Sequence, residues 1–136
     1  IEIVAGGITM IGIYLPNGNS GGEAGFAYKL AWMDRLAERV AKLLEDDQEV
    51  IILGDFNEWA RGIAKDILAE RLQSVDLSKH LRRRRTYPGF FPILHLDHIY
   101  YEGTIEVVKV TLPRDRMTLM ASDHLPLIAD VKIRFE

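Results

Sequence analysis

The feature that most limits the possible folds is an uninterrupted apolar run at residues 50–53, directly before a glycine and Asp55. Such a run is typical of a strand that is buried on both faces in a parallel sheet. A second β-branched run occupies residues 8–14. The apolar residues between the two runs recur at helical spacing, in a helix expected to end near residue 45: Leu30, Met33, Leu36, Val40 and Leu43. The order strand, helix, strand predicts a right-handed crossover between parallel strands.

The rest of the chain predicts one more helix and three more strands. Strand-forming residues are enriched over 96–101, 105–112 and 127–135, and the helix is indicated by Ile63, Ile67, Leu68 and Leu72. With 136 residues, of which 48% are hydrophobic and 27% charged, the chain has the length and composition of one folded domain, residues 1–136. We expect an α/β fold in which two helices cover a mixed β-sheet.

Composition and charge exclude several function classes. The sequence has no cysteine, which removes thiol nucleophiles, thiolate zinc sites and disulfides together. Its net charge is −3, whereas proteins that bind nucleic acid through their overall charge are strongly basic. Any contact with a polyanion must therefore be local. No apolar stretch approaches the roughly 20 residues of a membrane-spanning helix, so we expect no membrane partner and a cytoplasmic location.

Two polar residues follow the apolar run at residues 50–53. Asp55 and Asn57 stand two apart, so in an extended chain both side chains point to the same side of the sheet. Ligand sites of open α/β sheets form beyond the carboxyl ends of the strands. A carboxylate and an amide at that place could orient a water molecule and hold a phosphoryl oxygen. The alternative is that Gly-Asp-x-Asn is ordinary turn sequence.

Asp97 lies between apolar residues of an expected strand, where its carboxylate loses hydration unless another group pairs with it. His124 is a candidate partner, because an aspartate fixes the tautomer of an imidazole and raises its basicity. Asp123, next to it, offers a ligand for a hard cation. The alternative is that Ser122-Asp123 simply begins the last strand and that His124 is a hydrogen-bonded structural residue.

The concentrated positive charge of the sequence is a run of four arginines at residues 82–85. We predict phosphate contacts for Arg84 and Arg85, with a solvated loop neutralised by carboxylates as the alternative. His95 and His98 are expected to alternate across a strand, and we interpret them as structural.

Tyr14 and Asn17 lie at the end of the first expected strand. Their donors could bind an anion, although Tyr-x-Pro-Asn-Gly is also ordinary strand-to-turn sequence.

Taken together and in order, four motifs resemble those of the endonuclease/exonuclease/phosphatase superfamily. Its members share the deoxyribonuclease I-like fold and include exonuclease III and the apurinic endonucleases. The motifs span most of the chain: Ile13-Tyr14-Leu15-Pro16-Asn17-Gly18, Gly54-Asp55-Phe56-Asn57, Leu96-Asp97-His98-Ile99 and Ser122-Asp123-His124-Leu125-Pro126. The resemblance implies that Asp55 positions the attacking water or protonates the leaving oxygen and that Asn57 contacts the scissile phosphate. It also implies phosphate contacts for Tyr14 and Asn17.

The same resemblance implies roles for the last motif. His124 would act as the base or face the developing charge, oriented by Asp97, and Asp123 would be a ligand of the divalent metal. The ion would be Mg²⁺ or Mn²⁺, because hard cations prefer oxygen ligands and polarise phosphoryl oxygens.

The sequence departs from the family pattern upstream of Tyr14, where family members normally carry an early Asn and the principal metal-binding Glu. No Gln-Glu motif precedes Tyr14, and Glu2 has too little sequence around it to replace that ligand. We therefore expect an incomplete version of the family's four-layer α/β sandwich, impaired activity and apolar sheet surface left exposed. Residues 28–36 look most similar to exonuclease III and later segments to another branch, which suggests a chimera with a seam near residues 43–54.

Three functions are compatible with these observations. The first is a divalent-metal-dependent phosphodiester hydrolase of nuclease type, acting on nucleic acid or another phosphodiester. The second is a non-catalytic fragment or chimeric half-domain that forms a homodimer through the exposed sheet surface. The third is a phosphomonoesterase or phospholipase of the same superfamily, since the shared centre does not encode the alcohol part of the substrate.

Overall fold

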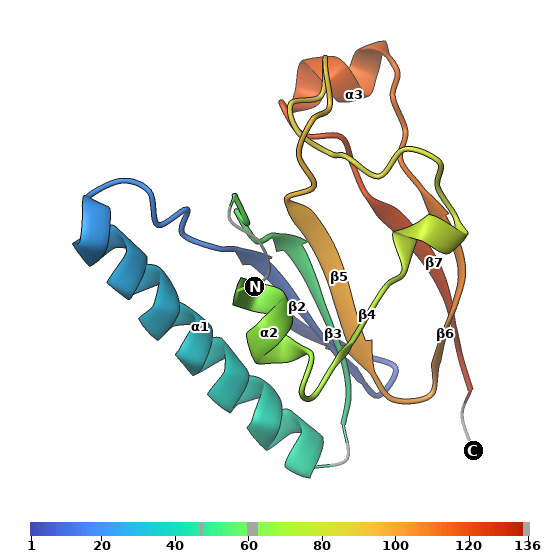
Figure 1. Ribbon diagram of the computed structural model, residues 1–136. Coiled ribbons are helices and arrows are strands. Elements are labelled where there is room, and N and C mark those ends of the chain that lie inside the picture. Colours follow the sequence, from blue (N-terminus) through green and yellow to red (C-terminus); the bar gives the residue numbers. More distant parts are fainter. Residues whose placement is uncertain (47, 60–62, 135–136) are drawn as a thin grey trace.

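The computed structural model describes residues 1–46, 48–59 and 63–134 of the chain. Its main sheet has five strands in the order β1-β2-β3-β5-β4 (Figure 1). β2 and β3 are parallel and the other neighbouring pairs are antiparallel, so the sheet is mixed, as expected. The strands are β1 (Glu2–Ala5), β2 (Ile8–Tyr14), β3 (Glu49–Asp55), β4 (Gln73–Ser74) and β5 (Asp97–Glu102).

Two helices cover one face of this sheet. α1 (Gly22–Glu45) is the connection between the parallel strands β2 and β3, and α2 (Ile63–Leu68) contacts it. The main core forms between this helix layer and the sheet; its members include Met33, Leu36, Val40 and Leu43 of α1 and Ile11, Val50, Ile52 and Tyr100 of the strands. Lys29, rather than the expected Leu30, occupies the first buried position of this helix face. Among the described residues, no helix has both the length and the apolar character needed to cross a bilayer.

A second, two-stranded sheet packs against the opposite face of the main sheet. It consists of β6 (Ile105–Thr111) and β7 (Ile128–Ile133), and two smaller apolar clusters fill the space between the sheets. The expected exposed apolar strand residues are present: Ile3, Val4, Leu53, Val108, Ile128 and Val131. A homodimer through these residues stays a prediction.

The segment before β7 differs from the sequence prediction. A short helix, α3 (Arg116–Ala121), lies between two of the expected strands, in a stretch for which no helix was predicted. Asp115 caps it, because its carboxylate accepts from the Thr118 backbone N–H at 2.9 Å. β7 begins only at Ile128, so residues 122–124 lie in a loop rather than in the last strand. That strand was predicted to reach residue 135, which lies outside the described residues.

Candidate active site

The registers of three neighbouring strands place polar residues from distant parts of the chain in one row. Tyr14 on β2 pairs with Asp55 on β3, and Asp55 pairs with Asp97 on β5. β2 and β3 are parallel and end at this edge, whereas the antiparallel β5 begins here. Directly paired residues point their side chains to the same side of a sheet. The two carboxylates therefore lie next to each other at the edge where α/β sheets form ligand sites.

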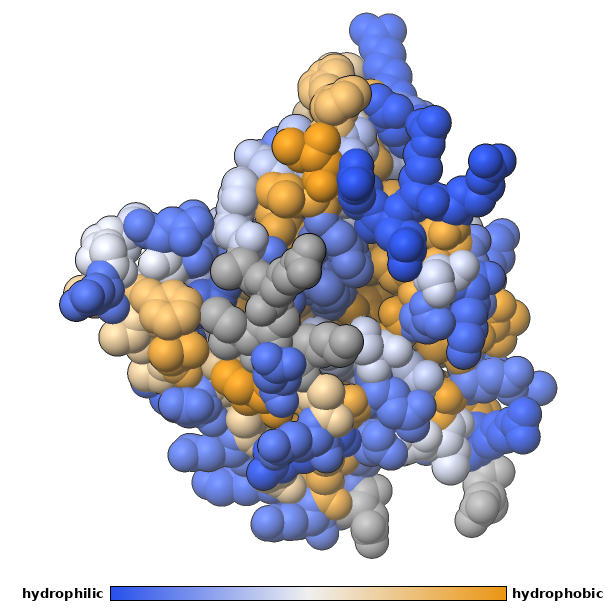
Figure 2. Space-filling model, in the orientation of Figure 1, coloured by the Kyte–Doolittle hydropathy of each residue, from blue (hydrophilic) through white to orange (hydrophobic). Residues whose placement is uncertain are grey.

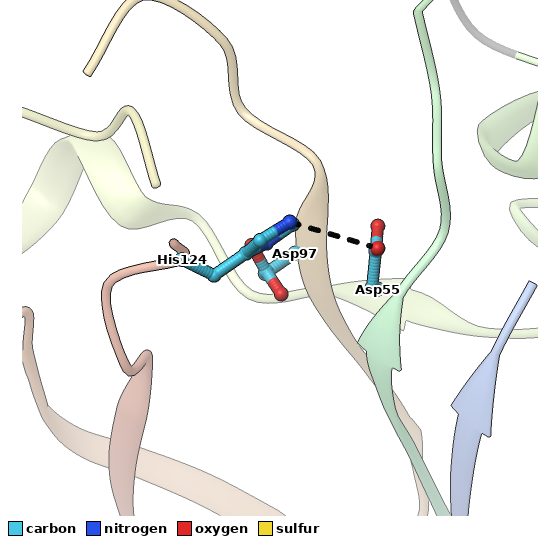
Figure 3. A group of neighbouring side chains, drawn as sticks. All are labelled: Asp55, Asp97 and His124. Atoms are coloured by element: carbon cyan, nitrogen blue, oxygen red, sulfur yellow. Dashed lines mark hydrogen bonds and ion pairs between the residues drawn. The ribbon is translucent and has the colours of Figure 1, made fainter. Parts of the chain in front are cut away.

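His124 reaches these carboxylates from the loop between α3 and β7 (Figure 3). Its Nδ1 lies 2.8 Å from Oδ2 of Asp97, and its Nε2 lies 3.8 Å from Oδ2 of Asp55. An ionised carboxylate can only accept, so the neutral ring donates Nδ1–H to Asp97 and keeps Nε2 as an acceptor. The geometry contains the Asp97–His124 pair that was expected from the sequence.

Asn57 is held beside Asp55 by a turn rather than by an extended strand. β3 ends at Asp55, and Asn57 has φ 48°, in the left-handed region that asparagine tolerates better than most residues. The backbone N–H of Asn57 donates to Oδ1 of Asp55 at 2.7 Å, and its Nδ2 donates to the carbonyl of Leu15 at 2.8 Å. Gly-Asp-x-Asn thus forms a turn and also presents both side chains at the site.

Lys29 is a residue of this region that the sequence analysis missed. It is buried on α1, and its Nζ donates to the backbone carbonyls of Phe56 at 3.1 Å and of Asn57 at 2.8 Å. Burial lowers the pKa of the Lys29 amine, and the charges of Glu58 and Asp55 act in the opposite direction. The available signal was its position on the apolar stripe of α1, where a buried lysine requires acceptors.

Most of the site residues predicted from the sequence surround a cleft of about 540 Å³, and Trp59 and Tyr87 also lie in its wall. Seven of the nine predicted site residues line it: Tyr14, Asn17, Asp55, Asn57, Asp97, Asp123 and His124.

Arg84 and Arg85 are not among the residues that line this cleft. They line a separate pocket, together with His95, His98 and Tyr100. The segment that separates the arginines from β5 folds back on itself, with the backbone N–H of residue 86 bonded to the carbonyl of residue 94 at 2.8 Å. Both arginines thus lie outside the cleft, and their phosphate contacts stay a prediction.

Burial dominates the electrostatics of Asp55. Desolvation raises the pKa of its carboxyl group, and the charge of Asp97 acts in the same direction. The backbone N–H of Asn57 and the charges of His124 and Lys29 act in the opposite direction. A carboxyl group with a raised pKa keeps its proton to a higher pH than an exposed aspartate does, which suits proton transfer.

His95 and His98 do not alternate across a strand. β5 begins only at Asp97, so His95 lies outside it, and the ring centres of the two histidines are 4.3 Å apart. Both Nε2 atoms are buried, with no hydrogen-bond partner in the described part of the chain. Desolvation lowers the pKa of His95 and lowers that of His98 to about 3, so the His98 ring is neutral at physiological pH.

Asp55, Asp97 and His124 are close enough to share one metal ion. One ligand atom from each lies within 4.8 Å of the others. Two carboxylates and an imidazole form a donor set that suits a divalent cation such as Mg²⁺ or Mn²⁺. Asp123, the predicted metal ligand, has an exposed side chain on the same cleft but is not a member of this group.

The sequence matches the model of the Endonuclease/Exonuclease/phosphatase family over residues 2–124. The chain belongs to this family. Members of the family are metal-dependent phosphoesterases. A relative from Escherichia coli K12, named Uncharacterized protein YbhP, is 33% identical over 108 residues, which are 79% of this chain and 42% of YbhP. The chain thus spans less than half the length of this relative.

Solved structures of several proteins share the fold of this chain. The 3′ phosphatase NExo from Neisseria, bound to a product DNA hairpin, matches with a TM-score of 0.72 and 21% identity, over 96% of this chain and 63% of that one. An AP endonuclease from Archaeoglobus fulgidus matches with a TM-score of 0.71 and 20% identity, over 97% and 64%. The predicted fold class, an α/β fold that is an incomplete version of the deoxyribonuclease I-like fold, is confirmed.

Proposed function

We propose that this protein is a divalent-metal-dependent phosphodiester hydrolase. The observation that carries the proposal is the meeting of Asp55, Asp97 and His124 on one cleft, with Asn57 and Tyr14 in its wall. An oriented imidazole, a carboxyl group with a raised pKa and donors for phosphoryl oxygens are the groups that ester hydrolysis requires. Family membership supports phosphoester chemistry in general.

In the proposed reaction, the oxygen of a water molecule bonds to phosphorus while the bond from phosphorus to the leaving oxygen breaks. Water passes a proton to Nε2 of His124, which Asp97 orients through Nδ1. Asp55 gives a proton to the leaving oxygen, a role favoured by the raised pKa of its carboxyl group. Asn57 donates one amide hydrogen to the carbonyl of Leu15 and has a second for a phosphoryl oxygen.

The proposed ion is Mg²⁺ or Mn²⁺. Asp97 and Asp123 offer it oxygen ligands on the cleft, while Asp55 keeps the role of proton donor. When bound, such an ion polarises a phosphoryl oxygen and stabilises the charge of the transition state.

Nucleic acid is the first substrate to test. The similar structures include a 3′ phosphatase bound to DNA and an AP endonuclease, and this supports a nuclease-like activity. The cleft residues described above recognise a phosphate group and not the alcohol attached to it.

Hydrolysis assays test the proposal. The substrates are bis(p-nitrophenyl) phosphate and a DNA duplex with an abasic site, each with Mg²⁺, Mn²⁺ or EDTA. Asp55→Asn and His124→Gln should each lower kcat/KM by about a hundredfold or more. Asp130→Asn, which changes an exposed aspartate of β7, should leave it unchanged. The proposal would be contradicted if the unmodified protein cleaved neither of the two substrates in the presence of Mg²⁺ or Mn²⁺.

Calorimetric titration with Mg²⁺ or Mn²⁺ tests the metal ligands separately. Asp123→Ala should weaken the affinity by about tenfold, as expected when one supporting carboxylate is lost from a metal centre. Asp130→Ala is the matched control. Equal affinities of the unmodified protein and of Asp123→Ala would remove Asp123 from the proposed centre.

A further inference from the structure

Four exposed apolar side chains at one end of the molecule have no role in the proposed reaction. Phe90 and Phe91 are 73% and 75% exposed, and Met117 and Met120 on α3 are 81% and 75% exposed. A single exposed apolar residue is common on a protein surface, but several of them close together mark an interaction site. We call these four residues the apolar tip.

The loop and the helix that carry the apolar tip are in contact. A Cβ atom at Gly89 would lie 3.2 Å from Cδ2 of Leu119 on α3, and the Gly89 N–H donates to the carbonyl of Asp123 at 2.6 Å. Nη2 of Arg114, just before α3, donates to the carbonyl of Phe90 at 2.6 Å. This is the α3 end of the molecule in Figure 1, and Figure 2 shows hydrophobic surface there beside strongly hydrophilic side chains.

Arginines border the apolar tip. A hollow of about 740 Å³ is lined by four arginines and four apolar residues, and its lining contains no carboxylate. The arginines are Arg82, Arg83, Arg85 and Arg114, and Pro92, next to the tip, is one of the apolar residues. None of the ion pairs between described residues involves these arginines. Most of the arginine run thus lies beside the tip, and its charge is available to an external anion.

The apolar tip also borders the catalytic cleft. Tyr87 precedes Phe90 by three residues and lines the cleft, and Asp123, which follows Met120 by three residues, lines it as well. A surface that binds the tip therefore lies close to the opening of the cleft.

We propose that the apolar tip and the arginine-lined hollow dock this protein on a membrane surface that contains anionic lipids. The apolar side chains enter the boundary between headgroups and acyl chains, and the guanidinium groups bind lipid phosphates. The substrate of the cleft is then a phosphodiester in a lipid headgroup, a conclusion that also rests on the proposed function.

The composition of the surface favours lipid over nucleic acid. Proteins that bind single strands stack bases on aromatic faces along a basic groove. Here two of the four tip residues are methionines, which have no aromatic face, and all four protrude into solvent. A hollow that combines arginines with apolar side chains matches an anionic headgroup joined to an acyl chain. The expectation of no membrane partner considered spanning helices alone, which a peripheral contact does not need.

Co-sedimentation with vesicles tests the docking. The protein should bind equimolar phosphatidylcholine and phosphatidylglycerol at least about tenfold more tightly than phosphatidylcholine alone. The double variant Phe90→Ser/Phe91→Ser should weaken this binding by about tenfold or more, and Arg82→Glu/Arg83→Glu should remove the preference for phosphatidylglycerol. The control is Ile3→Ser/Val4→Ser, an exposed apolar pair on β1, which should bind as the unmodified protein does.

Three results would overturn the docking proposal. They are absence of binding to the phosphatidylglycerol vesicles, equal losses in the tip variant and the β1 control, and tight binding of a single-stranded oligonucleotide that is lost in the tip variant. Hydrolysis of bis(p-nitrophenyl) phosphate separates this proposal from the proposed function. Vesicle binding without hydrolysis supports docking and rejects the catalytic function, whereas hydrolysis without vesicle binding rejects docking alone.

Discussion

Lys29 is a buried ionisable residue near the site and His98 a partly buried one, and burial lowers the pKa of both. Their contacts differ. Lys29 donates to two backbone carbonyls of the loop that carries Asn57. The Nε2 of His98 is buried and makes no hydrogen bond within the described ranges, and Oε2 of Glu58 lies 3.7 Å from it. Removal of the lysine should therefore destabilise the fold, whereas removal of the histidine should protect the fold against acid.

We expect Lys29→Met to lower the free energy of unfolding by about 2 kcal/mol, because it leaves two buried carbonyl oxygens without donors. The apolar stem keeps its packing, so the loss reports mainly the hydrogen bonds. Urea unfolding measures the stability, and phosphodiester hydrolysis should fall because the loop that positions Asn57 is loosened. Lys42→Met, at an exposed position of the same helix, is the control. Equal stabilities of the two variants would contradict this role of Lys29.

His98 should make the protein less stable in acid. Its ordinary pKa of 6.5 falls to about 3 in the folded state, so between these values the unfolded chain binds a proton that the folded chain does not. The contribution to stability is present above pH 6.5 and is lost as the pH falls towards 3. From pH 7 to pH 5, the unmodified protein should lose about 2 kcal/mol more than His98→Phe. Urea titrations at pH 7 and pH 5 measure the free energy of unfolding of both proteins. An equal loss of this free energy in the unmodified protein and in His98→Phe would contradict the prediction.

The end of β3 shows how one element positions the site. Gly54 has φ 143°, and a Cβ atom at this position would overlap the carbonyl oxygen of Ile13, its partner on β2. Glycine permits both the backbone conformation and the close approach of the strands. The next register step pairs Tyr14 with Asp55, so the spacing of β2 and β3 at Gly54 also sets the site.

Gly54→Ala should therefore destabilise the protein by about 3 kcal/mol, from backbone strain and from separation of the two strands. Gly12→Ala is the matched control on β2, because a Cβ there meets nothing closer than the Ile1 carbonyl at 3.9 Å. It should change stability by less than about 1 kcal/mol. Thermal unfolding of both variants measures the difference in stability. A loss of stability in Gly12→Ala as large as that in Gly54→Ala would disprove the steric explanation.

In the whole molecule, the main sheet and the loop after α3 must both fold before Asp55, Asp97 and His124 can meet. The two carboxylates repel each other, which contributes to the raised pKa of Asp55. A bound cation relieves this repulsion in the folded state only. Metal binding should therefore be coupled to folding.

A divalent ion at about tenfold above its Kd should stabilise the fold by about 1.4 kcal/mol, which corresponds to a rise in Tm of about 5 °C. Differential scanning calorimetry with Mg²⁺ or Mn²⁺ measures the shift, with choline chloride at equal ionic strength as the control. Asp55→Asn should reduce the shift. An identical rise with choline chloride would show that the effect is not due to metal binding.

The parts of the fold that the sequence predicted are those with a strong local pattern. The apolar runs of β2 and β3 and the stripe of α1 were visible because burial repeats along each element. The short helix α3 was not, because it is held by the Asp115 cap rather than by an apolar face. For the site, the strand end at Asp55 and the need of Asp97 for a partner were local signals, and both residues lie on the cleft.

The sequence by itself determined the identity of the reactive groups, the elements that carry them and the family to which the chain belongs. The tertiary structure decided which other groups meet. It brought His124 to Asp55 as well as to its expected partner Asp97, tied Lys29 to the loop of Asn57, and placed the arginine run beside the apolar tip instead of the cleft. These contacts join residues far apart in the chain. They depend on strand register and on the path of loops, which are set by packing and not by any local repeat.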